Sequence, residues 1–173
     1  MSLLDKFRAI TTFVFDVDGV FTDGTIWTFD DGQMVRRMNI KDGYALQLAI
    51  KKGYRVVVIS GGASAAVQIR LEKLGITDVY MQVTNKISIL QGYCKTHSIP
   101  VAEVLFMGDD IPDFGIMQMA GIACAPSDAV AEIKQVAHYI SPHAGGQGCV
   151  REVIEKVMKL KGDWSVDTGV SSK

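Results

Sequence analysis

The sequence is poor in cysteine, carries almost no net charge and has no long apolar run. Its three cysteines, Cys94, Cys124 and Cys149, lack the paired spacing of a disulfide framework or a zinc site, which favours a reducing compartment. Because 18 basic residues face 19 acidic ones, no overall field attracts nucleic acid or an anionic membrane. No apolar run approaches the ~18 residues of a membrane span. We therefore predict a cytoplasmic protein without nucleic-acid or membrane partners, in which any bound anion is held locally.

What the chain does have is a regular alternation of short β-branched runs with segments of helical period, which is typical of an α/β fold. Continuous apolar runs indicate parallel strands buried on both faces. Such runs occupy residues 12–18, 54–60, 104–110 and 121–126, with a weaker one at 77–81, and helical periodicity covers residues 63–75, 85–97 and 149–162. We predict a three-layer, Rossmann-like, doubly wound parallel sheet.

Two further segments complete the predicted organisation. Residues 24–40 are expected to form an antiparallel β-hairpin around the turn Asp30-Asp31-Gly32, as a flap after the first strand. The chain length suits one domain, which we place at residues 1–162. Residues 163–173 have little to pack and are expected to be a flexible C-terminal tail.

Polar residues gather where three of the predicted strands end. Asp16 and Asp18 follow the first strand, Ser60-Gly61-Gly62 the second, and Gly108-Asp109-Asp110 a later one. Because ligands of open parallel sheets bind beyond the carboxyl ends of the strands, these groups should meet in one cleft. Asp16 and Asp18 are two residues apart, so an extended backbone directs both to the same side. Such close like charges favour a hard cation with oxygen ligands, and Mg²⁺ fits best.

Each of these features also has a simpler explanation when it is taken alone. Ser60-Gly61-Gly62 can be a plain loop as readily as an anion-binding nest, and Lys86 can be a solvated helix lysine. Asp113, directly after Pro112, can be a charge in the first turn of a helix. The joint order of carboxylate pair, hydroxyl with glycines, lysine and second carboxylate pair favours one shared site. The three histidines stand alone and are assigned no metal-binding role.

In this order the residues resemble the haloacid dehalogenase superfamily of phosphohydrolases. The stretch DVDGVFTDG is similar to the first motif of that superfamily, Ser60 to the second, Lys86 to the third and GDDIPD to the fourth. The segments NIKDGYALQLA, RLEKLGI and AGGQGCVRE further resemble the phosphatases of 3-deoxy-D-manno-octulosonate 8-phosphate, which lack a cap domain. The resemblance implies a magnesium-dependent phosphomonoesterase of lipopolysaccharide sugar biosynthesis, acting through an aspartyl-phosphate intermediate.

The resemblance also implies a role for each candidate residue. It makes Asp16 the nucleophile and Asp18 the general acid and base. It gives Mg²⁺ the carboxylates of Asp16 and Asp109 and the backbone carbonyl of Asp18, with Asp110 and Asp113 near or behind the metal. It implies that the phosphoryl oxygens are bound by Ser60, the Gly61 amide and Lys86. It implies that the sugar is bound by Asn39, Lys41, Asp42, Gly43 and Arg70.

Three departures from the pattern of these phosphatases keep the sugar open. Lys41, Gln47 and Gly62 stand where enterobacterial members have arginines, whose forked guanidinium suits a sugar carboxylate better. The phosphate of another acidic keto sugar, such as a nine-carbon sialic-acid-like 9-phosphate, is therefore the alternative substrate. Residues 39–43 can also be an ordinary helix start capped by Asp42.

Two other classes of protein remain to be weighed. A receiver domain also combines strand-end aspartates, a hydroxyl and a lysine, but its phosphoacceptor follows a middle strand rather than the first. A non-catalytic oligomerisation module of the same fold has no need for all these ionisable groups. Phosphate release that depends on Mg²⁺ separates both classes from a phosphatase.

The spacing of the motifs leaves no segment for a cap domain, since the hairpin, helices and strands already fill residues 24–86. We therefore expect a homo-oligomer in which a neighbouring subunit closes each cleft, and the resemblance implies that it is a tetramer. Ile26, Trp27 and Phe29 of the hairpin would pack on other copies of the chain, and the alternative is that they pack on their own domain. The resemblance implies that the tail, residues 162–173, reaches a neighbour's site.

Overall fold

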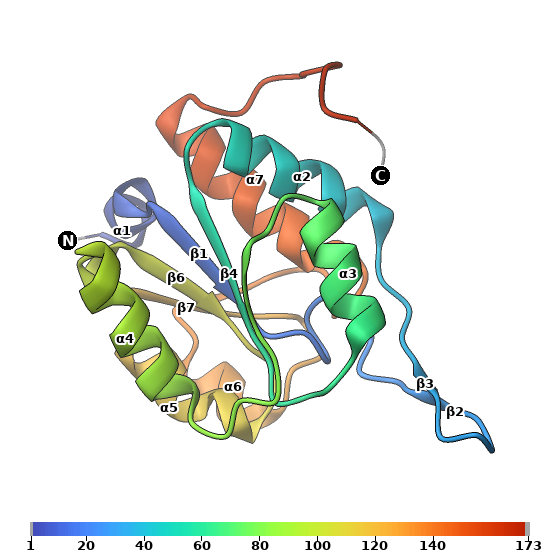
Figure 1. The fold of residues 1–173 in the computed structure, drawn as a ribbon. Coiled ribbons are helices and arrows are strands. Elements are labelled where there is room, and N and C mark those ends of the chain that lie inside the picture. Colours follow the sequence, from blue (N-terminus) through green and yellow to red (C-terminus); the bar gives the residue numbers. More distant parts are fainter. Residues whose placement is uncertain (1, 172–173) are drawn as a thin grey trace.

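The computed structural model describes residues 2–171 as a six-stranded parallel sheet between two layers of helices (Figure 1). The sheet has the strand order β5-β4-β1-β6-β7-β8. Its strands are β1 (Thr12–Phe15), β4 (Arg55–Ile59), β5 (Asp78–Tyr80), β6 (Val104–Met107), β7 (Ile122–Ala125) and β8 (Tyr139–Ile140). The predicted doubly wound α/β fold is confirmed, and all five predicted strands are present.

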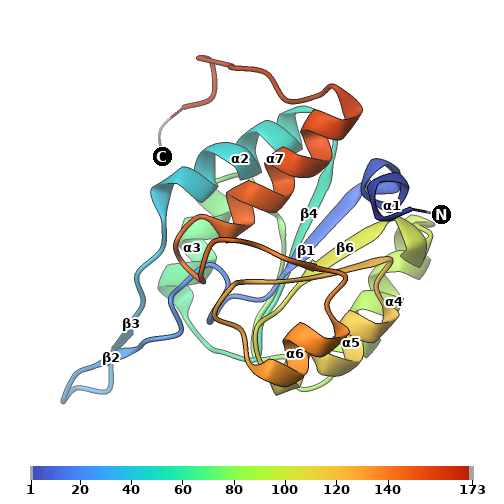
Figure 2. The ribbon, with the colours of Figure 1, turned by 180° about the vertical axis from the view of Figure 1, so that it is seen from behind.

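Helices cover both faces of the sheet, as Figures 1 and 2 show from opposite sides. They are α1 (Leu3–Ala9), α2 (Ile40–Lys51), α3 (Ala65–Lys73), α4 (Lys86–His97), α5 (Phe114–Met119), α6 (Ala131–Val136) and α7 (Cys149–Lys161), with short 3₁₀ turns η1 (Val101–Glu103) and η2 (Ile111–Asp113). Phe13 and Phe15 of β1 face the layer of α1, α2, α3 and α7, while Val14 faces that of α4, α5 and α6. The continuous apolar run of β1 is thus explained by burial on both faces.

The course of the chain places the carboxyl end of β1 at the centre of the molecule. From β1 the chain continues to β4 and β5 on one side, and then returns through α4 to β6 on the other side of β1. A ligand crevice forms where the strand order reverses in this way, because the loops after the two central strands separate. The crevice is therefore expected beyond Phe15, Ile59 and Met107.

The predicted hairpin is present after β1. It consists of the antiparallel strands β2 (Trp27–Thr28) and β3 (Met34–Val35), and Gly32 adopts a positive φ of 84° in the turn between them. The hairpin extends away from the body of the molecule (Figure 1), so its apolar side chains are exposed. These are Ile26, Trp27, Phe29, Met34 and Val35.

The segment after α7 makes more contacts than the sequence led us to expect. Trp164 packs edge-on against Tyr44, and the Asp167 carboxylate lies 2.6 Å from Lys51 Nζ. Tyr54 donates a hydrogen bond of 2.6 Å to Asp163. Residues 163–171 therefore run back along α2, and the expectation that they have little to pack is wrong. Residues 172 and 173 of the predicted tail lie outside the described residues, and its flexibility stays a prediction.

All three cysteines are buried and free, in line with the absence of paired spacing. Among residues 2–171, none of the helices combines the length and the apolar character that crossing a bilayer requires.

The start of α2 corrects the predicted cap. Asn39, not Asp42, caps this helix, since its side chain accepts a hydrogen bond of 2.9 Å from the Lys41 amide. Asp42 is buried instead and accepts a hydrogen bond of 2.8 Å from the Arg151 amide in the first turn of α7. Because Gly148 has no side chain to cap α7, Asp42 supplies a capping oxygen from the neighbouring helix.

The variant Asp42→Asn tests how much the buried charge of Asp42 lowers the free energy of unfolding. Burial raises the pKa of Asp42 to about 6, against the opposing effects of Arg151 and His143. A raised carboxyl pKa means that the folded state gains stability below pH ~4 and loses it as the pH rises towards ~6. Asparagine keeps an acceptor without the charge, so we expect the free energy of unfolding at pH 7.5 to rise by about 1–2 kcal/mol.

Denaturant unfolding at several pH values checks this expectation. The decline in stability between pH 4 and 6 should be shallower in Asp42→Asn than in the wild type. Asp30→Asn, on the exposed hairpin turn, is the matched control and should change neither quantity. A clear loss of stability in Asp42→Asn at pH 7.5 would mean that α7 requires the negative charge itself.

Candidate active site

The polar residues that follow three neighbouring strands meet in one cleft of about 310 Å³ beyond the carboxyl ends of β1, β4 and β6. The structure brings together the predicted residues Asp16, Asp18, Ser60, Gly61, Lys86, Asp109, Asp110 and Asp113, and adds Gly24, Gly62, Val83, Thr84 and Pro112 to the lining. Parallel strands bring their carboxyl ends to one edge of a sheet, so residues far apart in sequence become neighbours here.

Lys86 occupies the centre of this cleft. It is the first residue of α4, and its Nζ lies 2.9 Å from Asp16 Oδ1 and 2.6 Å from Asp113 Oδ1. Its side chain is only 6% exposed, so the interpretation of Lys86 as a solvated helix lysine is wrong. Burial by itself would lower the pKa of Lys86, but the two carboxylates raise it above its ordinary value. Lys86 is therefore a buried, charged ammonium group that touches the predicted nucleophile.

The carboxylates around Lys86 repel one another. Burial raises the pKa of Asp16 to about 7, with a further contribution from the charge of Asp113. Burial also raises the pKa of Asp109 to about 7, together with the charges of Asp16 and Asp113. One lysine does not balance this group of carboxylates, so a further positive charge would stabilise their ionised forms.

Two glycines make the close approach of these carboxylates possible. Gly19 has a positive φ of 79°, and a Cβ on it would overlap the carboxylate of Asp109. A Cβ on Gly108 would overlap the carboxylate of Asp113 in the same way. Thr22 fixes the turn, since its buried Oγ1 accepts hydrogen bonds of 3.2 Å from the amides of Gly19 and Gly24.

The donor set of the cleft fits a hard divalent cation. Asp16, Asp109 and Asp113 each offer a carboxylate oxygen, and these oxygens lie within 4.8 Å of one another. Asp113 already accepts a hydrogen bond from Lys86 Nζ and one of 3.2 Å from the Asp109 amide. Asp16 and Asp109 are thus the better candidates for direct ligands, and Asp113 lies behind them. All-oxygen donors of this kind match the preference of Mg²⁺.

Ser60 and the two glycines after it also line the cleft. Ser60 is buried at the end of β4, and its Oγ accepts a hydrogen bond of 3.1 Å from the Gly62 amide. The hydroxyl hydrogen is then available for donation to a ligand oxygen. Gly61 is exposed in the loop that follows, and its amide can serve the same ligand. Asp110 lies at the rim, where its carboxylate accepts a hydrogen bond of 2.8 Å from the Ile111 amide.

Asp18 has a partner that the sequence did not reveal. Arg36 Nε lies 2.7 Å from Asp18 Oδ1, and Arg36 Nη2 lies 3.3 Å from Asp18 Oδ2. The neighbouring Arg37 points outwards, with its side chain 72% exposed, as expected from the alternation of an extended segment. The pair Arg36-Arg37 on the predicted hairpin was visible in the sequence, but nothing in it indicated which of the two pairs with Asp18.

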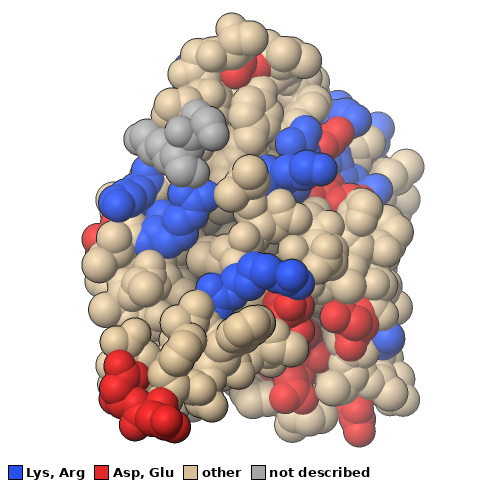
Figure 3. Space-filling model, turned by 90° about the vertical axis from the view of Figure 1, so that its right-hand side faces the viewer, with Lys and Arg blue, Asp and Glu red and all other residues tan. Residues whose placement is uncertain are grey.

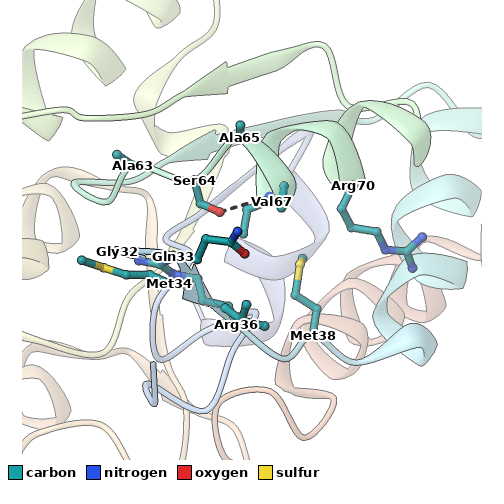
Figure 4. Close-up of a pocket in the computed structure, with 12 residues that line it drawn as sticks. Gly32, Gln33, Met34, Arg36, Met38, Ala63, Ser64, Ala65, Val67 and Arg70 are labelled. Carbon is teal, nitrogen blue, oxygen red and sulfur yellow. Dashed lines mark hydrogen bonds between the residues drawn. The ribbon is translucent and has the colours of Figure 1, made fainter. Parts of the chain in front are cut away.

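The five residues predicted to contact the sugar do not line the carboxylate cleft of their own chain. Asn39 caps α2, Asp42 binds α7, and Lys41 is exposed beside Gln147 and Arg151. Arg70 lines a separate groove of about 510 Å³ between the hairpin and α3, together with Arg36 (Figure 4). A Cβ on Gly43 would lie 3.2 Å from Arg70 Nη2, so this glycine leaves room for the guanidinium. Their binding of a sugar stays a prediction.

The surface on the hairpin side carries both signs of charge. Figure 3 shows Lys and Arg side chains next to groups of Asp and Glu on this face. This agrees with the net charge of −1, and the local binding of an anion stays a prediction.

Comparisons with known proteins place this arrangement among phosphohydrolases. The sequence model of the haloacid dehalogenase-like hydrolases matches residues 65–154. The 3-deoxy-D-manno-octulosonate 8-phosphate phosphatase KdsC of Escherichia coli K12 is 31% identical over 160 residues, which cover 92% of this chain and 85% of that protein.

Two crystal structures are closely similar to the whole fold. The enzyme of the same name from Yersinia pestis gives a TM-score of 0.91 at 28% identity, covering 93% of this chain and 87% of its own. The phosphatase from Moraxella catarrhalis, solved in complex with a magnesium ion, a phosphate ion and a KDO molecule, gives a TM-score of 0.90 at 31% identity and covers 92% of both chains.

Asp109→Asn tests the cation site without any assumption about substrate. The change removes one of several mutually repelling charges, so the variant should be more stable than the wild type in a chelator, by about 1–2 kcal/mol. Millimolar Mg²⁺ should raise the melting temperature of the wild type and leave that of the variant nearly unchanged, because a ligand stabilises only a state that binds it.

Thermal unfolding with and without Mg²⁺ measures both effects. Asp30→Asn removes the same charge far from the cleft and should respond to Mg²⁺ like the wild type. An equal stabilisation of Asp109→Asn by Mg²⁺ would exclude Asp109 as a ligand.

Proposed function

The chain belongs to the family of haloacid dehalogenase-like hydrolases, and we propose that it is a magnesium-dependent phosphatase that hydrolyses 3-deoxy-D-manno-octulosonate 8-phosphate. The observation that carries this proposal is the buried Asp16 carboxylate, which contacts Lys86 in the same cleft as Asp109. The relatives in Escherichia coli and Moraxella catarrhalis support the sugar, the first by its name and the second by the KDO molecule bound to it.

In this proposal the reaction proceeds in two steps, and residues of this chain transfer the phosphoryl group and the protons. A carboxylate oxygen of Asp16 attacks phosphorus, the bond between phosphorus and the sugar oxygen breaks, and Asp18 gives a proton to the departing oxygen. Asp18 then takes a proton from water as that water attacks the phosphorus of the aspartyl-phosphate. The bond to Asp16 breaks, and phosphate leaves with Asp16 restored.

The remaining residues of the cleft hold the phosphoryl group during these steps. Lys86 Nζ, the Ser60 hydroxyl and the Gly61 amide donate hydrogen bonds to the phosphoryl oxygens, where negative charge accumulates in the transition state. Asp113 orients Lys86 through their contact of 2.6 Å. Mg²⁺ bound to the carboxylates of Asp16 and Asp109 and the backbone carbonyl of Asp18 would neutralise charge on the same oxygens.

Three positions of the sequence bear on the identity of the sugar. By the resemblance, Lys41, Gln47 and Gly62 stand where enterobacterial members of the group have arginines. A lysine or a glycine suits a sugar carboxylate less well than an arginine fork, which favours one alternative, the phosphate of another acidic keto sugar such as a nine-carbon sialic-acid-like 9-phosphate. A non-catalytic oligomerisation module is disfavoured, because such a module gains nothing from a buried lysine among several carboxylates.

The working form in this proposal is a cytoplasmic homotetramer. The exposed hairpin side chains, led by Trp27 at 69% exposure, form an apolar surface that other copies of the chain can bury. A two-stranded ribbon is marginally stable alone, so packing between hairpins would also stabilise it. The three free, buried cysteines agree with a reducing compartment.

A phosphate-release assay on a panel of sugar phosphates tests the activity. We expect the eight-carbon substrate to give the highest kcat/KM, with the nine-carbon acidic sugar phosphate as the main competitor. Asp16→Asn should lower kcat by at least ~10³-fold, because it removes the nucleophile, while Asp30→Asn should keep wild-type activity. Release of phosphate by Asp16→Asn at the wild-type rate would exclude the covalent mechanism.

Sedimentation tests the assembly separately. The wild type should have about four times the chain mass of 18.8 kDa, and Trp27→Glu should shift it towards smaller species, since a charge in an apolar contact is costly. An active monomer at assay concentration would contradict the tetramer. Deletion of residues 163–173 should lower activity if the tail reaches a neighbouring site, and unchanged kinetics would exclude that role.

A further inference from the structure

Arg36 is the exception in an otherwise exposed segment. Every residue from 24 to 37 is exposed apart from Arg36, whose side chain is only 5% exposed. It directly follows β3, on the arm that leads from the hairpin back to α2. An arginine is among the least favourable residues to bury, so the placement of this one side chain in the body of the protein requires a compensating contact.

That contact is the carboxylate of Asp18. The Nε and Nη2 atoms of Arg36 meet the two oxygens of Asp18 at 2.7 and 3.3 Å, which is the forked geometry specific to arginine. Among residues 2–171, the structure gives the Asp18 side chain no other hydrogen-bond partner. Arg36 Nη1, by contrast, is buried without any partner in the same part of the chain.

Gly62 supplies the space for this pair. A Cβ on Gly62 would lie 3.0 Å from Asp18 Oδ2 and 3.4 Å from Arg36 Nη2, so any side chain there would press on both partners. The backbone of Gly62 does not have a positive φ, and its glycine identity is therefore explained by space rather than by conformation.

We propose that Arg36 is a positioning residue for the phosphatase reaction, which fixes the carboxylate of Asp18 towards the cleft and thereby makes its orientation depend on the hairpin. The inference rests on the proposed function, in which Asp18 transfers the protons. A carboxylate that transfers a proton must point at the reacting oxygen. The side chain of Asp18 is 34% exposed, and within the described part of the chain only Arg36 makes hydrogen bonds to it.

One alternative is that Arg36 has a structural role only and anchors the hairpin to the body of the protein. In that case the loss of Arg36 would alter folding or assembly. Any fall in kcat would then be the same with aspartate or asparagine at position 18. A second alternative is that Arg36 binds the substrate directly, in which case its loss would raise KM and would add to the loss caused by a change at Asp18.

The experiment is a double-mutant cycle between positions 18 and 36 with steady-state kinetics on the best sugar phosphate of the panel. Arg36→Gln should lower kcat by about 10–100-fold and change KM by less than about threefold. Arg36→Lys, which keeps the charge but not the fork, should recover part of the lost kcat. In an Asp18→Asn background, Arg36→Gln should cause no further loss beyond about twofold.

Arg37→Gln is the matched control. It removes the same charge from the adjacent residue of the same arm, where Arg37 contacts Asp23 with its side chain 72% exposed. Its kcat and KM should stay within about twofold of the wild type. Thermal unfolding and sedimentation of each variant show whether the fold and the assembly are kept, and Arg36→Lys serves if Arg36→Gln does not fold.

The outcomes separate the inference from the proposed function. A wild type that releases no phosphate from the whole panel overturns both. An active wild type with normal kcat in Arg36→Gln overturns only the positioning role. A further large loss in the Asp18→Asn background, or a rise in KM without a fall in kcat, also overturns it in favour of anchoring or substrate contact.

Discussion

The ion pairs of Lys86 with Asp16 and Asp113 join three separate parts of the chain. Asp16 follows β1, Lys86 begins α4, and Asp113 ends the turn after β6. One ammonium group therefore links the ends of the two central strands to the start of a helix. Removing one member of a buried pair leaves an unpaired charge and typically costs about 3–5 kcal/mol. The cleft is therefore a site of concentrated charge inside a mostly apolar fold, and its geometry depends on that lysine.

The same charges explain why the site is suited to phosphate chemistry. Burial and mutual repulsion raise the pKa values of Asp16 and Asp109 to about 7, and a divalent cation is the group that relieves this repulsion. Gly19 and Gly108 allow the carboxylates to come close, because any Cβ there would overlap them. The glycines thus leave space for carboxylates that repel one another. Such unfavourable arrangements are common at functional sites, where a protein gives up stability for function.

The hairpin connects this site to the outer surface. Its apolar side chains are exposed, while Arg36 alone turns inwards to the carboxylate of Asp18. A movement of the hairpin, for example on assembly with other copies, would move the guanidinium and with it the acid and base of the proposed reaction. Among residues 2–171, the pair of Arg36 with Asp18 is thus a direct contact between the exposed hairpin and the cleft.

The sequence by itself determined the α/β fold, the five main strands and the cleft, because apolar runs, helical periods and strand-end carboxylates are local patterns with fixed geometric consequences. It did not determine that Lys86 is buried, that Asp42 caps α7 rather than α2, or that Trp164 packs on Tyr44. The partner of Asp18 was equally hidden, since Arg36 and Arg37 are identical in type and adjacent. Only the tertiary structure decided these points, because the burial and partners of a side chain depend on segments that are distant in sequence.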